Sequence, residues 1–261
     1  MTRTVQQLFD LKGKTALVTG GSRGLGWQMA QALGEAGARL VLTSRKAHDL
    51  EAAAQELQAQ GIDAQWIAAD CANEADIQRL VAEATEKLGH IDILVNNAGA
   101  SWGAPAQDHP VSAWDKVMDL NVRGYFLLSQ AVAKAGMLER GGRIINLASI
   151  AGLGGNPTEM KTIAYNTSKG AVLNFTRALA AEWGPHGITV NAICPGFFRT
   201  KMAEVLIDTM GEEKMAGRAP LRRLGDSEDL KGLTVLLASD AGKHITGQWM
   251  AVDGGVSAIL G

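Results

Sequence analysis

The sequence predicts an α/β fold in which one doubly wound parallel sheet of about seven strands carries helices on both faces. Three observations indicate this fold. Short apolar runs alternate with longer stretches rich in Ala, Leu, Glu and Gln along nearly all of the 261 residues. Several of those stretches end at a glycine of the kind that caps a helix, as at Gly37, Gly89 and Gly184. A glycine-rich turn joins the first apolar run to the first helical stretch.

The elements follow one another in a regular order. Apolar runs that predict buried parallel strands lie at residues 15–19, 40–43, 65–68, 91–95, 143–147, 189–193 and 249–252. Helical patterns lie between them at residues 25–36, 49–60, 74–88, 112–138, 163–183 and 227–238. Residues 199–224 have no strand pattern, and we expect them to form a substrate flap. Because no linker or change of composition divides the chain, we expect residues 1–261 to form a single domain.

The composition excludes several classes of protein. The formal net charge is −2 and Lys and Arg do not cluster, so we expect no nucleic-acid partner. No apolar stretch approaches the ~20 residues that cross a bilayer, so we expect no membrane association and a cytoplasmic location. Two cysteines and five scattered histidines predict neither a disulfide framework nor a metal site.

The turn after the first predicted strand is suited to binding a dinucleotide. It reads Thr19-Gly20-Gly21-Ser22-Arg23-Gly24-Leu25-Gly26 and runs directly into a helical pattern. Glycines let the backbone approach a pyrophosphate, which the N–H groups and dipole of the following helix then stabilise. Such turns also arise for packing alone. The position in a strand–turn–helix unit near the start of the chain favours the cofactor interpretation.

The end of the second predicted strand indicates which dinucleotide is bound. Sites that prefer NAD place Asp or Glu there to bind the ribose hydroxyls. This chain instead has Ser44 and Arg45 at that place, and Arg23 lies in the glycine-rich turn. These side chains are suited to a 2′-phosphate, and the alternative is that the arginines are ordinary solvated charges. The sequence therefore predicts NADP(H) in preference to NAD(H).

Polar residues that can carry chemistry follow the fourth and fifth predicted strands. Asn97 lies in an Asn-Asn-Ala-Gly run, and Ser149 comes two residues after the fifth strand. Tyr165 and Lys169 are four residues apart and therefore share one face of a helix. A nearby ammonium lowers the pKa of a phenol from about 10 toward neutral, where general acid–base catalysis is effective. Tyr125, the other tyrosine, lacks a lysine at this spacing and is interpreted as helix packing.

Taken together, these residues strongly resemble the short-chain dehydrogenase/reductases from Leu11 to Gly255. The matching features are TGGSRGLG at 19–26, NNAG at 96–99, Asn121, Ser149, YNTSK at 165–169 and PGFFRT at 195–200. The resemblance implies a Rossmann-type domain and an NAD(P)-dependent oxidoreductase that interconverts a ketone and a secondary alcohol. It also implies a homotetramer or homodimer.

The resemblance assigns roles to individual residues. Tyr165 would be the general acid or base, Lys169 would lower its pKa and bind the nicotinamide ribose, and Ser149 would orient the carbonyl. Asn121 would hold a water that links Lys169 to solvent. Asp70 and Cys71 match the position that contacts adenine. The cofactor contacts implied in this way are Gly20, Ser22, Arg23, Gly24, Leu25, Gly26, Ser44, Arg45, Asp70, Cys71, Asn97, Ala98, Gly99, Tyr165, Lys169, Pro195, Gly196 and Thr200.

The substrate is the least determined part of the prediction, because the Ser149–Tyr165 interval is longer than is usual in the family. Candidate pocket residues are mostly apolar: Trp102, Leu153, Phe197, Phe198, Met202, Leu206 and Met210. An apolar mouth suits an acyl chain, and the sequence is similar to 3-oxoacyl thioester reductases, which act on acyl-carrier-protein or CoA substrates. A similarity to gluconate 5-dehydrogenase-like enzymes is nearly as good, with Glu159 and Lys161 suited to reading hydroxyls. A catalytically silent cofactor sensor is a remote alternative.

Overall fold

The computed structural model describes residues 2–259, apart from the side chains of Met202, Val205 and Leu206. Seven parallel strands form one sheet in the order β3-β2-β1-β4-β5-β6-β7. The strands are β1 (Thr15–Thr19), β2 (Arg39–Ser44), β3 (Ala64–Ala68), β4 (Ile93–Asn96), β5 (Gly142–Leu147), β6 (Ile188–Pro195) and β7 (Trp249–Val252). The order reverses between β1 and β4, and ligands bind at such a reversal. The predicted doubly wound α/β fold is confirmed.

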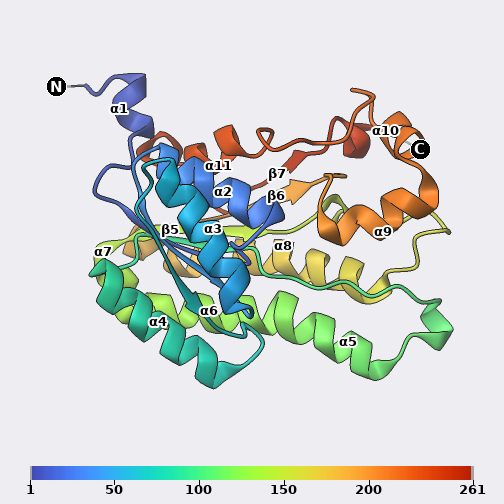
Figure 1. The fold of residues 1–261 in the computed structure, drawn as a ribbon, viewed down its shortest axis with the longest axis horizontal. Helices are drawn as coiled ribbons and strands as arrows, with labels where there is room; N and C mark the ends of the chain where they lie inside the picture. Colours follow the sequence, from blue (N-terminus) through green and yellow to red (C-terminus); the bar gives the residue numbers. More distant parts are fainter. Residues whose placement is uncertain (1, 260–261) are drawn as a thin grey trace.

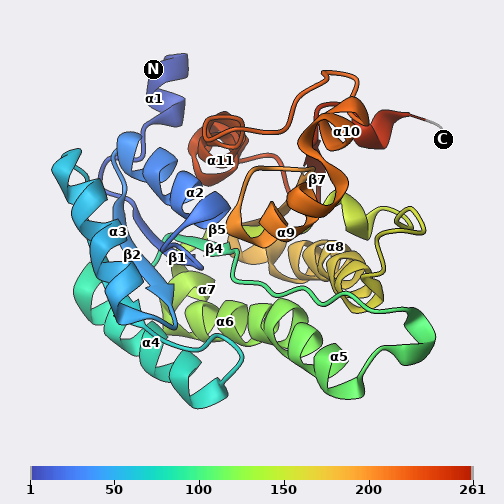
Figure 2. The ribbon, with the colours of Figure 1, turned by 45° about the vertical axis from the view of Figure 1, so that its right-hand side comes forward.

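Helices cover both faces of the sheet (Figures 1 and 2). The helices are α1 (Val5–Phe9), α2 (Gly24–Glu35), α3 (Ala47–Ala59), α4 (Glu74–Leu88), α5 (Val111–Met118), α6 (Gly124–Val132), α7 (Leu138–Arg140), α8 (Ile163–Trp183), α9 (Lys201–Met210), α10 (Glu212–Gly217) and α11 (Lys231–Ala238). Successive strand residues point to opposite faces, so Val18 packs in the core with α2, α3 and α11, whereas Leu17 packs with α4, α6 and α8. Within the described residues no helix is long and apolar enough to cross a membrane.

The long central helix differs from the continuous one expected over 112–138. It is interrupted by two π-helical turns, Asp119–Arg123 and Ala133–Met137. After the first turn, α6 begins at Gly124, where a Cβ would lie only 2.3 Å from the backbone oxygen of Cys71. Glycine therefore lets α6 pass close to the chain that follows β3. Short π-helical segments are frequent at functional sites, and this one carries Asn121.

Two further segments near the carboxyl end of the chain bear on the predicted elements. The helix expected over 227–238 begins only at Lys231, because Asp229 accepts hydrogen bonds from Arg223 and from the Asp226 backbone and so holds the preceding residues in a turn. The expected flap, residues 199–224, contains α9 and α10. Both helices follow β6 and lie beyond the carboxyl ends of the strands (Figures 1 and 2).

Candidate active site

The residues expected to carry chemistry converge at the carboxyl ends of β4 and β5, next to the reversal between β1 and β4. Ser149 follows β5, and its Oγ accepts a hydrogen bond from the Ala151 backbone at 3.1 Å, which starts a short 3₁₀ turn. Tyr165 and Lys169 lie in the first two turns of α8. The side chain of Lys169 is almost fully buried, and its residue is only 2% exposed. The structure therefore brings the predicted catalytic side chains to one edge of the sheet.

Asn121 connects three parts of this edge. Its Oδ1 accepts from the Ala100 backbone N–H at 2.8 Å, and its Nδ2 donates to the Ala100 carbonyl and to Ser168 Oγ, both at 2.9 Å. Ser168 in turn donates to the Tyr165 carbonyl at 2.7 Å. Both amide hydrogens of Asn121 are therefore used within the protein. The water that the resemblance assigns to Asn121 would therefore donate to the side-chain or backbone carbonyl oxygen of Asn121, because the amide hydrogens are already engaged.

The ammonium of Lys169 lies between two aromatic rings. Its Nζ is 5.6 Å from the ring centroid of Tyr165 and 5.6 Å from that of Tyr125, and it donates to the Leu147 carbonyl at 2.6 Å. A Cβ on Gly99 would lie 3.8 Å from Nζ, so the loop after β4 passes close to the amine. The sequence predicts no role for Tyr125 in the site, because no lysine lies four residues after it. Its contact with Lys169 joins α6 to α8, and a spacing pattern within one helix does not reveal such a contact.

Burial dominates the protonation of these groups. It lowers the pKa of Lys169 to about 8. It also raises the pKa of Tyr165, and this effect outweighs the opposing effect of a hydrogen bond with Ser149. We expected Lys169 to lower the pKa of the phenol. The protein groups by themselves do not produce that result, because an amine with a pKa near 8 loses its charge before a phenol of raised pKa ionises.

The glycine-rich turn forms a cradle that side chains would fill. Gly20 and Gly24 have positive φ angles of 63° and 58°. At Gly26 a Cβ would lie 2.3 Å from Asn97 Nδ2 and 2.4 Å from the Gly20 oxygen. Asn97 Nδ2 donates to the Thr19 carbonyl at 2.7 Å, and Thr19 Oγ1 accepts from the Asn97 backbone at 2.9 Å. Asn97 therefore ties the end of β4 to the turn after β1, a structural role that sequence reasoning did not foresee.

The edge expected to bind a 2′-phosphate is accessible. Ser44 ends β2, and Arg45 is exposed. Arg23 approaches Asp49 at 3.6 Å in an ion pair whose two side chains are both partly exposed. Surface ion pairs of this kind contribute ~0–1 kcal/mol, so a phosphate can compete for Arg23. The residues present thus fit the phosphate of NADP(H).

The two residues expected to contact adenine, Asp70 and Cys71, differ in their surroundings. Asp70 Oδ1 accepts from the Ala72 backbone at 3.0 Å, and the Asp70 N–H donates to Asp76 at 2.8 Å. The Cys71 thiol is packed in the core between the sheet and α4, and burial raises its pKa to about 12. Its side chain behaves as a small apolar core residue, so a nucleotide at this position would meet backbone.

The turn after β6 approaches the glycine-rich turn from the other side. Pro195 ends β6, and the Gly196 N–H donates to the Val252 carbonyl at 2.9 Å. Thr200 caps α9, and its Cγ2 lies 3.6 Å from where a Cβ on Gly24 would be. The base of the flap therefore contacts the loop expected to hold the pyrophosphate.

The long loop before Tyr165 is held by its own polar contacts. Asn156 Nδ2 donates to Thr162 and to Asn166 at 2.9 and 3.0 Å. Glu159 accepts from Arg218, after α10, at 2.7 Å. This ion pair joins the loop to the flap. It also engages the carboxylate that was expected to read hydroxyls of a sugar acid.

The expected pocket residues do not all face a pocket. Phe198 is only 4% exposed and packs against Gly225, so it belongs to the core. Leu153 packs partly against the cluster that contains Tyr125. Trp102, in contrast, is 46% exposed in the loop after β4. The predictions for Met202 and Leu206 concern side chains outside the described part of the chain.

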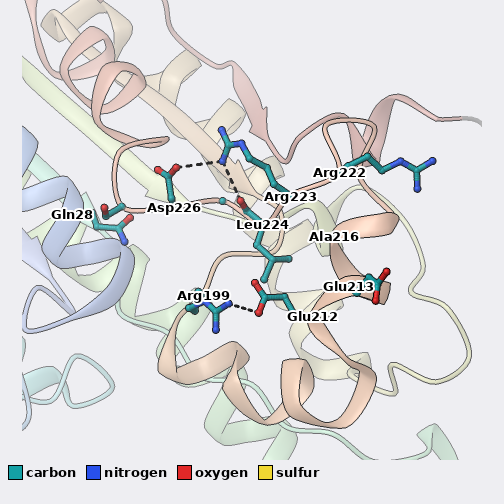
Figure 3. Close-up of a pocket in the computed structure, with 11 residues that line it drawn as sticks. Gln28, Arg199, Glu212, Glu213, Ala216, Arg222, Arg223, Leu224 and Asp226 are labelled. Atoms are coloured by element: carbon teal, nitrogen blue, oxygen red, sulfur yellow. Dashed lines mark hydrogen bonds and ion pairs between the residues drawn. The ribbon is translucent and has the colours of Figure 1, made fainter.

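A separate hollow is lined partly by residues of the expected flap (Figure 3). It has a volume of about 820 Å³ and lies between α2, the flap and the loop after α10. Its lining residues are Gln28, Arg199, Glu212, Glu213, Ala216, Arg222, Arg223, Leu224, Gly225, Asp226 and Ser227. Ion pairs engage Arg199 with Glu212 and Arg223 with Asp226 (Figure 3). None of the predicted catalytic residues lines this hollow, so we do not assign the chemistry to it.

A dinucleotide cradle beside a Ser–Tyr–Lys set defines an oxidoreductase of the Rossmann type. The chain belongs to the short-chain dehydrogenase/reductase family. The family model that matches is described as enoyl-(acyl carrier protein) reductase, and the match covers residues 20–257. The predicted family and enzyme class are thereby confirmed.

Two relatives and one solved structure cover nearly the whole chain. Gluconate 5-dehydrogenase of Gluconobacter oxydans is 38% identical over 255 residues, which are 97% of this chain and 98% of the relative. The rhamnolipids biosynthesis 3-oxoacyl-[acyl-carrier-protein] reductase of Pseudomonas aeruginosa is 40% identical over 252 residues, or 95% and 97%. A crystal structure of a gluconate 5-dehydrogenase from Burkholderia cenocepacia in complex with NADP and tartrate superposes with a TM-score of 0.93, at 34% identity over 98% of this chain and 100% of that one.

Proposed function

We propose that this protein is an NADP(H)-dependent reductase of 3-oxoacyl thioesters, carried on acyl carrier protein or CoA, with Tyr165 as the general acid. The observation that carries the proposal is the convergence of Ser149, Tyr165 and Lys169 beside the glycine cradle. NADP in the Burkholderia cenocepacia relative supports the cofactor, as do the accessible Arg23 and Arg45. When bound, the reduced cofactor supplies a hydride to the carbonyl carbon.

The side chains of the protein handle the oxygen of the substrate. Ser149 Oγ donates a hydrogen bond to the carbonyl oxygen, which becomes more negative as the carbon is reduced. The Tyr165 phenol donates its proton to the same oxygen, and the alcohol forms. In alcohol oxidation the Tyr165 phenolate takes that proton back. A charged Lys169 stabilises the phenolate in either direction, so its protonation is part of the mechanism.

The surroundings of the site favour an acyl substrate over a sugar acid. Trp102 and Ile163 are large apolar residues, 46% and 43% exposed, in the loop after β4 and at the start of α8. Exposed apolar side chains beside a site suit an alkyl chain.

Gluconate oxidation is the second candidate, favoured by the relative from Gluconobacter oxydans at 38% identity. The complete Ser149, Tyr165 and Lys169 set argues against a silent cofactor sensor.

The deciding experiment compares NADPH oxidation with acetoacetyl-CoA against NADP⁺ reduction with gluconate, using the same enzyme preparation. We expect turnover of the thioester. Turnover of gluconate without thioester activity would reverse the proposal.

We also propose a homotetramer, or a homodimer, and a cytoplasmic location. Phe126 on α6, Trp249 on β7 and Ile259 near the carboxyl end are 47%, 40% and 54% exposed. Large apolar side chains exposed on helix and strand surfaces support self-association. Light scattering of the purified protein measures the oligomeric mass.

A further inference from the structure

Tyr125 is the largest of the fully buried side chains, and it lies beside the catalytic set. It follows the π-helical turn that carries Asn121 and comes directly after Gly124, where α6 passes close to the Cys71 backbone. These contacts fix the place of the ring. Its hydroxyl donates to the Leu147 carbonyl at 3.3 Å, and Lys169 Nζ donates to the same oxygen at 2.6 Å.

We propose that Tyr125 is a positioning residue that holds the Lys169 ammonium between two ring faces and keeps it directed toward Tyr165. The geometry has three anchors. The Leu147 carbonyl accepts from Nζ at the end of β5, and the ring centroids of Tyr165 and Tyr125 each lie 5.6 Å from Nζ. This inference rests on the proposed function, because it gives Lys169 its role in stabilising the phenolate.

Apart from the two rings and the Leu147 carbonyl, the groups near the amine give its charge little stabilisation. Cys194 on β6 faces Lys169, but burial raises the pKa of its thiol to about 11, so it is neutral at physiological pH. In the loop after β4, a Cβ on Gly99 would lie 3.8 Å from Nζ, and glycine brings no charge there. Within the described residues, no ion pair engages the Lys169 side chain. Besides the Leu147 carbonyl, which accepts from the amine at 2.6 Å, the two π-faces are therefore the groups that favour the charged amine over the neutral one.

The contact matters because burial favours the neutral amine. The pKa of Lys169 is lowered to about 8, so a modest change in ring contacts moves the amine across the working pH. A desolvated cation–π contact corresponds to a pKa shift of roughly 0.5–1.5 units. Loss of the Tyr125 ring should therefore lower the pKa of Lys169 further. Lys169 would then lose its charge at a lower pH, and above that pH Tyr165 would have no charged neighbour.

A matched pair of variants tests the proposal. Tyr125→Phe removes the hydroxyl and keeps the ring, whereas Tyr125→Leu removes the ring. NMR of protein labelled at lysine Cε follows each amine through a pH titration, and the Lys169 signal is assigned by its loss in Lys169→Met. We expect the pKa of Lys169 in Tyr125→Leu to lie about one unit below its value in Tyr125→Phe. Equal values in two folded variants would overturn the proposal.

A second readout uses activity. In Tyr125→Leu the alkaline limb of kcat for acetoacetyl-CoA reduction should move to lower pH by a similar amount, whereas a purely structural defect would lower kcat at every pH alike. Should Tyr125→Leu fail to fold, pentafluorophenylalanine at position 125 keeps the ring shape and reverses its quadrupole, so it must lower the pKa of Lys169 in the same way. An unchanged pKa there would refute the role of Tyr125. Because the NMR titration needs no substrate, it separates failure of this inference from failure of the proposed activity.

Discussion

Gly26 is the position where a single methyl group should do most damage to the cofactor cradle. In Gly26→Ala the added Cβ would lie 2.3 Å from Asn97 Nδ2 and 2.4 Å from the Gly20 oxygen. Alanine in a helix is favoured over glycine by ~1 kcal/mol. Against that, displacing Asn97 from its carbonyl partners costs ~1–3 kcal/mol, and crowding a backbone oxygen costs a similar ~1–3 kcal/mol. The net expectation is a destabilisation of about 1–5 kcal/mol, centred near ~3 kcal/mol.

Thermal unfolding and NADPH titration measure the two consequences. At ~2–4 °C per kcal/mol for a chain of this size, a loss of ~3 kcal/mol should lower Tm by about 6–12 °C. The dissociation constant of NADPH should rise about tenfold or more, because the turn that holds the pyrophosphate moves. Gly232→Ala is the matched control, since Gly232 lies exposed in α11 with nothing within 4 Å of its Cβ position. The control should gain ~0.5–1 kcal/mol. Equal stability and equal NADPH affinity in Gly26→Ala and wild type would contradict the steric argument.

Three further predictions address chemistry, cofactor choice and pH. Tyr165→Phe should lower kcat by about 10²–10⁴-fold in steady-state assays while NADPH still binds, and near-normal turnover would exclude Tyr165 as the acid. Arg45→Ala should raise the NADPH dissociation constant and leave that of NADH nearly unchanged, as measured by fluorescence titration; equal weakening of both would show that Arg45 does not read the 2′-phosphate. Because the pKa of Lys169 is lowered on folding to about 8, the unfolded chain binds the extra proton between pH 8 and the ordinary lysine pKa near 10.5, and wild-type stability should rise there relative to Lys169→Met. Urea unfolding across that range would show a constant difference if the amine were not buried.

The strands and the longest helix could be predicted because burial leaves a clear sequence pattern. β1 and β7 have the expected bounds, Thr15–Thr19 and Trp249–Val252, and α8 has the expected 163–183. Parallel strands covered on both faces are continuous apolar runs, which local composition reveals. That Tyr165 and Lys169 lie together on one face of α8 could be predicted for a similar reason, because they are close in sequence.

Contacts between distant segments could not be predicted in this way. Tyr125 meets Lys169 only because α6 and α8 pack on the same face of the sheet. The π-helical turn at Asn121 is followed by the close approach of Gly124 to the chain after β3, a contact that no local propensity encodes. Asp229 delays the start of α11 through hydrogen bonds to Arg223 and the Asp226 backbone. In each case the local structure depends on a contact formed by packing or in a turn. The sequence pattern indicates which residues are buried and with what periodicity, and it does not indicate these contacts.

The tie between Thr19 and Asn97 has a consequence for the dynamics of ligand binding. The ladder between β1 and β4 ends at the Val18–Val95 pair, and Thr19 Oγ1 then accepts from the backbone N–H groups of Asn97 and Ala98 at 2.9 and 3.0 Å. These hydrogen bonds hold the ends of β1 and β4 together in the free protein. We therefore expect that the entropy lost on binding NADPH comes mainly from ordering of the flap, residues 199–224. Amide hydrogen exchange at Asn97 and Ala98 should be slow in the free protein and change little when NADPH is added, while protection in α9 and α10 increases.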